Sequence, residues 1–153
     1  MLESIADDQT LRASGARPVA LGWATVELDR AASELGAALG LHAGRYADAA
    51  PSPALGARCR LAINGFDDGI DLVLLEPSTE GRLAASLARH DEGPAAVWFG
   101  VDSLPAAMVI LRRLGLATTV VRRGPLGSER LLLGGPIHGP HRLVVERPGT
   151  IRA

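Results

Sequence analysis

The chain has no lysine, one cysteine and few aromatic residues, and each of these shortages argues against a class of chemistry or of partner. All 16 basic residues are arginine, so chemistry that needs a lysine amine, such as a Schiff base, is excluded. The single cysteine, Cys59, has no partner for an internal disulfide, and we expect it to be a small buried residue. Aromatic residues make up 3% and the net charge is −1. Nucleic-acid binding usually requires a basic surface, often with aromatic residues on which bases stack, so we expect no nucleic-acid partner.

Long apolar runs are also missing. None approaches the ~18 residues of a membrane-spanning helix, which predicts that the protein has no membrane partner. The first 17 residues are acidic and polar, whereas a secretion signal is basic and then apolar. We interpret residues 1–17 as a short helix or loose tail and expect a cytoplasmic protein. The 153 residues, 47% hydrophobic and 22% charged, are typical of one soluble globular domain.

The sequence does contain an internal repeat. The stretch "LGWATVELDRAASELGAALGL" (21–41) resembles "AVWFGVDSLPAAMVILRRLGL" (96–116) at an offset of 75 residues, which aligns Trp23 with Trp98. A second pair, "DLVLLEP" (71–77) and "RLVVERP" (142–148), matches at an offset of 71. The chain has only two tryptophans, so their alignment carries more weight than matches between alanines or leucines.

Each half of the repeat predicts the same order of elements. A strand, about Ala20–Glu27 or Ala95–Val101, leads into an amphipathic helix, and three strand-like stretches follow. The order βαβββ therefore occurs twice, which predicts an α+β fold. We expect a first module at residues 18–77, a linking helix at 78–93 and a second module at 94–149.

Paired βαβββ modules in a chain of this length resemble the vicinal oxygen chelate superfamily. This superfamily includes glyoxalases, bleomycin-resistance proteins, extradiol dioxygenases and methylmalonyl-CoA epimerases. The likeness covers about Val19–Arg147 and is closest to an epimerase-like or glyoxalase-like branch, because "LLEPSTEGRLAASLARHDEGPAAVWFGVD" has that branch's strand end, short helix and "EG". The resemblance implies a single glyoxalase-like domain whose two modules form a U-shaped mixed sheet around a central cleft.

The resemblance also implies where a metal would bind. Metal-dependent members hold one divalent ion with four inward-facing side chains, two from each module. The corresponding positions here are Leu21, Val73, Ala96 (or Ala95, if the register shifts by one) and Val144, flanked by Leu143 and Val145. Divalent ions need oxygen, imidazole or thiolate donors, and these side chains have none. We therefore expect neither a metal nor another cofactor.

Strand alternation from the four metal positions predicts the lining of the cleft. On the two central strands it turns Trp23, Thr25, Trp98 and Gly100 inward. On the strands beside them it adds Asp71, Leu75, Arg142 and Glu146. The expected ligand-binding residues are Trp23, Thr25, Val73, Ala96, Trp98, Arg142, Val144 and Glu146. We expect the Arg112–Arg113 pair on the second helix to be a solvated face.

Three functions are compatible with this lining. The first is a metal-independent small-molecule binding protein that holds a partly aromatic or acyl ligand between the two indoles. The second is an isomerase or lyase acting on a small acid or acyl-CoA, with Glu146 or Asp71 as a metal-free base. The third is a degenerate structural subunit without a pocket, in which the tryptophans fill the cleft as core. We also expect a homodimer, because broad sheets leave exposed edges that need cover.

Overall fold

The computed structural model describes residues 11–12, 14–39, 46–63, 69–134 and 139–147. In chain order the elements are β1 (Arg17–Ala24), α3 (Leu28–Leu39), β2 (Ala47–Ser52), β3 (Ala57–Ala62), β4 (Asp71–Pro77), α4 (Arg82–His90), β5 (Gly93–Val101), α5 (Leu104–Arg113), β6 (Arg122–Gly124), β7 (Gly127–Leu131) and β8 (His141–Glu146). The order βαβββ occurs twice, and α4 lies within the segment predicted to link the halves. None of the described helices is long and apolar enough to span a membrane.

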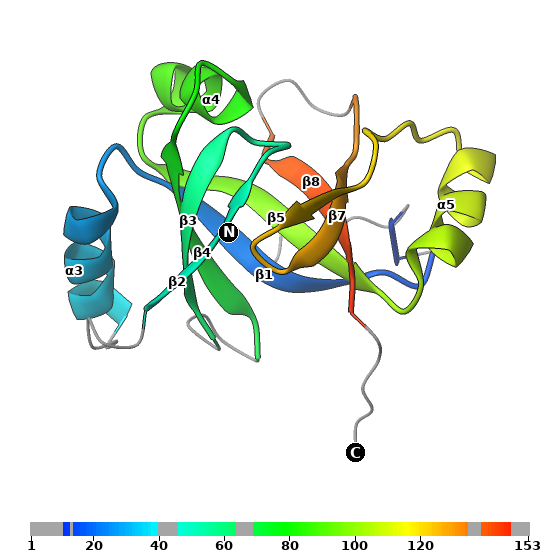
Figure 1. Cartoon of the computed structure of the whole chain (residues 1–153), viewed down its shortest axis with the longest axis horizontal. Helices are drawn as coiled ribbons and strands as arrows, with labels where there is room; N and C mark the ends of the chain where they lie inside the picture. Colours follow the sequence, from blue (N-terminus) through cyan, green and yellow to red (C-terminus); the bar gives the residue numbers. More distant parts are fainter. Residues whose placement is uncertain (1–10, 13, 40–45, 64–68, 135–138, 148–153) are drawn as a thin grey trace.

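All eight strands form one mixed sheet in the order β2-β3-β4-β1-β5-β8-β7-β6. The pairs β1–β4 and β5–β8 are parallel, and the antiparallel pair β1–β5 joins the two modules. The sheet curves into a U with α3 outside one wall and α5 outside the other, while α4 lies over one end (Figure 1). The edge strands β2 and β6 contact each other, so the U is nearly closed. The predicted α+β fold with two modules around a U-shaped sheet is confirmed.

The apolar side chains divide among three clusters, because successive residues of a strand point to opposite faces of the sheet. The cleft cluster lies between the walls and consists of Val19, Ala20, Ala24, Leu55, Ala57, Cys59, Val73, Leu75, Leu83, Ala95, Ala96, Trp98, Leu131, Leu143 and Val145. The α5 cluster consists of Leu11, Ala16, Leu21, Val97, Phe99, Val101, Leu104, Ala107, Met108, Leu111, Leu132 and Val144. The α3 cluster consists of Ala31, Ala32, Ala62, Leu72 and Leu74, with Trp23, Leu28, Leu35 and Tyr46 packed against it.

The first strand and helix repeat at an offset of 76 residues, not the predicted 75. The helices α3 and α5 begin at Leu28 and Leu104, which are 76 residues apart. The predicted alignment paired Val26 with Val101, but Val26 is 62% exposed and Val101 only 3%. Thr25, which is fully buried, is the true counterpart of Val101. The alignment of the two tryptophans is therefore wrong by one residue.

Candidate functional site

Trp98 fills the middle of the cleft. Its side chain is fully buried in the cleft cluster and lies over Gly22, its counterpart in the repeat. A Cβ added at Gly22 would lie 2.8 Å from Trp98 Cζ3 and 2.8 Å from Leu75 Cδ1. The indole therefore occupies the space above β1 that a side chain on Gly22 would need. This arrangement agrees with the third hypothesis, in which a tryptophan becomes core.

The polar end of Trp98 is satisfied by a buried carboxylate that the sequence reasoning missed. Its Nε1–H donates to Glu129 Oε1 at 2.8 Å, and the Ser52 hydroxyl donates to Glu129 Oε2 at 2.8 Å. Glu129 has no exposed surface, and burial raises its pKa, while the hydrogen bonds from Trp98 and Ser52 lower it. Ser52 is on β2 and Glu129 on β7, so these bonds hold the two walls of the U together. The sequence pattern that could have indicated this buried carboxylate is the single glutamate that alternates with leucines in "SERLLLG".

Only part of the predicted apolar lining reaches the cleft. Val73 and Ala96 belong to the cleft cluster with Trp98, whereas Leu21 and Val144 belong to the α5 cluster. Trp23 packs on the α3 cluster, on the opposite face of the sheet from Trp98. The prediction that the two indoles share a face is wrong, because a one-residue slip in register turns a side chain to the other face.

Of the predicted polar residues, only Asp71 is on the cleft face, where it alternates with Val73 and Leu75. Thr25 lies past the end of β1, where its hydroxyl donates to Glu92 Oε2 at 2.7 Å. Asp71 is buried and its Oδ2 accepts from Arg147 Nη2 at 3.0 Å. Arg142 pairs in register with Val97 of the α5 cluster, and Glu146 pairs with Val101 of the same cluster. Both therefore belong to the outer face.

The donor set of the cleft does not fit a divalent ion. Val73 and Ala96, the two family ligand positions that face the cleft, carry no donor atom. Cys59 also lies there, but burial raises its pKa to about 12, so it remains a thiol at neutral pH. Within the described part of the chain, no group of three His, Cys, Asp or Glu side chains could hold an ion. The expectation that no metal binds stays a prediction.

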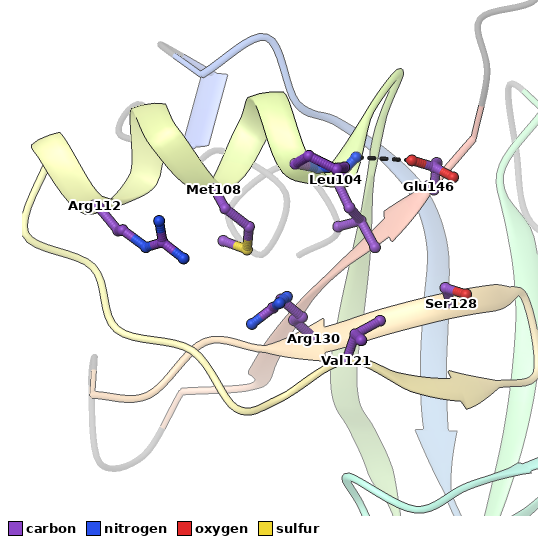
Figure 2. Close-up of a pocket in the computed structure, with 8 residues that line it drawn as sticks. Leu104, Met108, Arg112, Val121, Ser128, Arg130 and Glu146 are labelled. Atoms are coloured by element: carbon purple, nitrogen blue, oxygen red, sulfur yellow. Dashed lines mark hydrogen bonds between the residues drawn. The ribbon is translucent and has the colours of Figure 1, made fainter.

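A cavity of about 480 Å³ lies on the outer side of the second module, between α5 and the β6–β7 hairpin (Figure 2). We call it the outer pocket, lined by Leu104, Pro105, Met108, Arg112, Val121, Ser128, Arg130 and Glu146. Strand alternation explains this face, because Ser128 and Arg130 of β7 point away from the cleft residue Glu129. Arg112 lines this pocket and is exposed, as is Arg113, in agreement with the predicted solvated face.

Arg130 is the unusual group of the outer pocket. Its side chain is half-buried, and Nη1 donates to the Thr119 carbonyl at 3.0 Å. Its Nε is buried and has no acceptor. No carboxylate of the described residues lies within ion-pair distance of this guanidinium. A charged group has thus been partly withdrawn from water without a counterion, which is costly.

Glu146 lies at the other end of the outer pocket. Its Oε2 accepts from the Leu104 backbone N–H at 2.9 Å, at the first turn of α5 (Figure 2). Its counterpart in the first module is Glu76, whose Oε2 accepts from the Leu28 N–H at 3.1 Å at the start of α3. Each carboxylate therefore caps the helix of its own module.

Comparison with known proteins finds likeness in structure and not in sequence. No family model and no curated protein sequence matches the chain. Solved structures include a variant of methylmalonyl-CoA epimerase from Streptomyces coelicolor in complex with 2-nitronate-propionyl-CoA, with a TM-score of 0.71 and 25% identity over 87% of this chain and 98% of that chain. Methylmalonyl-CoA epimerase from Mycobacterium tuberculosis has a TM-score of 0.70 and 22% identity over 87% and 88%. A hypothetical protein from Bacillus halodurans has a TM-score of 0.70 and 16% identity over 90% and 99%.

The predicted resemblance is thus confirmed by structural neighbours along most of the chain, with epimerases among them. Together with the paired modules and the U-shaped sheet, these neighbours show that the chain has the fold of the vicinal oxygen chelate superfamily.

Proposed function

We propose that this protein is a metal-independent small-molecule binding protein, and that its ligand is an organic acid with an apolar acyl or aryl body. The proposed site is the outer pocket and not the cleft. The observation that supports it is Arg130, a half-buried guanidinium that lines a cavity of about 480 Å³ and has no carboxylate partner among the described residues.

The chemistry of the outer pocket favours a carboxylate with an apolar body. Leu104, Met108 and Val121 supply apolar walls, and Arg112 and Arg130 lie near each other at one end (Figure 2). An arginine binds a carboxylate through two parallel N–H···O bonds, which compensates the guanidinium for its lost water. Concave, mostly apolar pockets with a few polar groups are the usual form of small-molecule sites.

The cleft is a weaker candidate for the same ligand. Trp98, Val73 and Ala96 are fully buried against their neighbours. The only charged side chain bonded to the indole, Glu129, is an acceptor already occupied by two donors. An acidic ligand there would meet apolar surface and a buried carboxyl group, and Arg147, which lies against Asp71 on the cleft side, already has that carboxylate as its partner.

A second candidate function is an isomerase or lyase acting on an acyl group. It is favoured by one neighbouring structure, a methylmalonyl-CoA epimerase variant in complex with an acyl-CoA analogue. Glu146 is the one carboxylate among the residues that line the outer pocket, and its Oε1 would be the base. Asp71, the other candidate base, lies on the cleft side and is ion-paired with Arg147. Exchange of the α-proton of an acyl thioester with deuterium, lost in Glu146→Gln, would support this candidate; no exchange would exclude it.

Calorimetric titration tests the binding function. Benzoate and hexanoate are the probes, and benzamide and hexanamide are their neutral counterparts. We expect each acid to bind about tenfold or more tightly than its amide, because a hydrogen bond to a charged group contributes ~1.5–3 kcal/mol. Arg130→Gln should abolish this preference.

The matched control is Arg113→Gln, which removes the same charge from an exposed position of α5 outside the pocket lining. It should leave both affinities unchanged. If Arg130→Gln lowers the unfolding temperature too far, Arg112→Gln serves instead and should weaken benzoate binding more than benzamide binding. Equal affinity for acids and amides in the unmodified protein would contradict the proposal.

A further inference from the structure

A second basic pocket lies at the end of the U that α4 covers. Two adjoining cavities of about 150 and 300 Å³ share the lining residues Arg82, Arg89, Gly139 and His141. We call them together the α4 pocket. The helix α4 supplies the two arginines of this pocket, and the start of β8 supplies the histidine.

The helical period places the basic groups of α4 on one face. Arg82, Ser86 and Arg89 follow the spacing i, i+4, i+7, and all three line the smaller cavity. Leu83 and Leu87 lie on the opposite face and pack against the cleft cluster. The apolar face thus fixes the rotation of the helix, and that rotation turns both arginines toward His141.

No acidic lining residue of the α4 pocket balances the charges of Arg82 and Arg89. Neither cavity is lined by an acidic residue, and among the described residues neither Arg82 nor Arg89 forms an ion pair. Burial and the charges of Arg82 and Arg89 lower the pKa of His141, and a hydrogen bond to the Arg82 backbone opposes this. Two guanidinium groups and a serine hydroxyl therefore surround a small cavity beside a half-buried imidazole.

We propose that the α4 pocket binds the phosphate group of a small phosphomonoester. Two arginine forks and a hydroxyl match the several acceptor oxygens and the double negative charge of a phosphate. The smaller cavity takes the phosphate. The adjoining larger cavity, lined also by Leu131, Leu132 and Leu133, takes the organic part of the ligand.

The test is calorimetric titration of the full chain with phenyl phosphate and with inorganic phosphate. Phenyl phosphate should bind more tightly, because only it fills the larger cavity. The double variant Arg82→Gln/Arg89→Gln should weaken its binding by about tenfold or more, because two charge-assisted contacts are lost. Both arginines are exposed, so the variant should keep the unfolding temperature of the parent.

The matched control is Arg113→Gln/Arg123→Gln, which removes the same net charge from exposed positions outside the α4 pocket. An equal loss in the control would show a general charge effect and overturn the site. Equal binding of the two probes would overturn the assignment to a phosphomonoester, and no binding of either would overturn the proposal. The phenyl phosphate binding that Arg82→Gln/Arg89→Gln removes should persist in Arg130→Gln, and benzoate binding should persist in Arg82→Gln/Arg89→Gln, so the two sites are tested separately.

Discussion

At the residue scale, the contact between Trp98 and Glu129 explains why the cleft is filled as core. A tryptophan in a core needs a partner for its indole N–H, and a buried carboxyl group needs donors. Each satisfies the other, and Ser52 supplies the second donor. The described interior of the U thus contains a hydrogen-bonded chain of Trp98, Glu129 and Ser52.

The first prediction concerns the pH dependence that Glu129 adds to stability. Its folded-state pKa is raised, mainly by burial, so the folded state binds this proton more tightly than the unfolded state. Stability is therefore lost as pH rises from the unfolded value of about 4.3 through the raised folded value. Glu129→Gln cannot ionise and should escape this loss, so its stability relative to the parent should rise across that window.

Urea unfolding of both proteins at a series of pH values measures this difference. All other titrating groups, including Glu92 with its lowered pKa, are common to the two proteins and cancel. A constant difference between the two curves from acid to neutral pH would show that Glu129 does not titrate in the way its burial requires.

At the element scale, the two modules share a hydrogen bond that their amino-acid sequences, aligned at the predicted offset, do not show. Glu76 follows the apolar run of β4 and caps α3, as Glu146 follows that of β8 and caps α5. The second offset is therefore 70, not the predicted 71. These caps fix where each helix starts and so which of its residues meet the sheet.

A second prediction follows from this cap. Glu76→Ala should lower the free energy of unfolding by about 1–2 kcal/mol, because α3 loses the acceptor of the Leu28 N–H at its first turn. The loss of the ion pair with Arg58 adds little, since Arg58 is largely exposed. Glu80→Ala removes an exposed carboxylate outside the helices and is the control for denaturant unfolding. Equal stability of both variants would mean that the cap does not matter.

The fold could be predicted from the sequence because it depends on patterns that tolerate an error of one residue. Alternating strands, amphipathic helices and the double βαβββ order remain visible at an offset of 75 or 76. The lining of the cleft could not be predicted in the same way. An error of one residue in the alignment assigned Trp23, Leu21 and Val144 to the cleft, whereas they lie on the outer face of the sheet. Ser52 and Glu129 meet across 77 residues of sequence, and no local pattern indicates such a contact.

At the scale of the whole molecule, the sheet keeps the form of its structural neighbours while the U is nearly closed. The edge strands β2 and β6 contact each other, and the cleft cluster draws side chains from both modules. This contact covers part of the edges from which a homodimer was predicted; the dimer itself stays a prediction. The outer pocket, whose Arg130 has no ion-pair partner among the described residues, lies instead outside the second module, between α5 and β7.

The central claim is that the organic acid binds in the outer pocket and that the cleft is core. Nuclear magnetic resonance of ¹⁵N-labelled protein titrated with benzoate tests it directly, because the only two tryptophans give two indole N–H signals. We predict that the backbone amide signals of Met108, Ser128 and Arg130 move with benzoate concentration while the Trp98 indole signal stays in place. Movement of the Trp98 indole signal together with the amides of Val73 and Ala96 would place the ligand in the cleft and contradict the account.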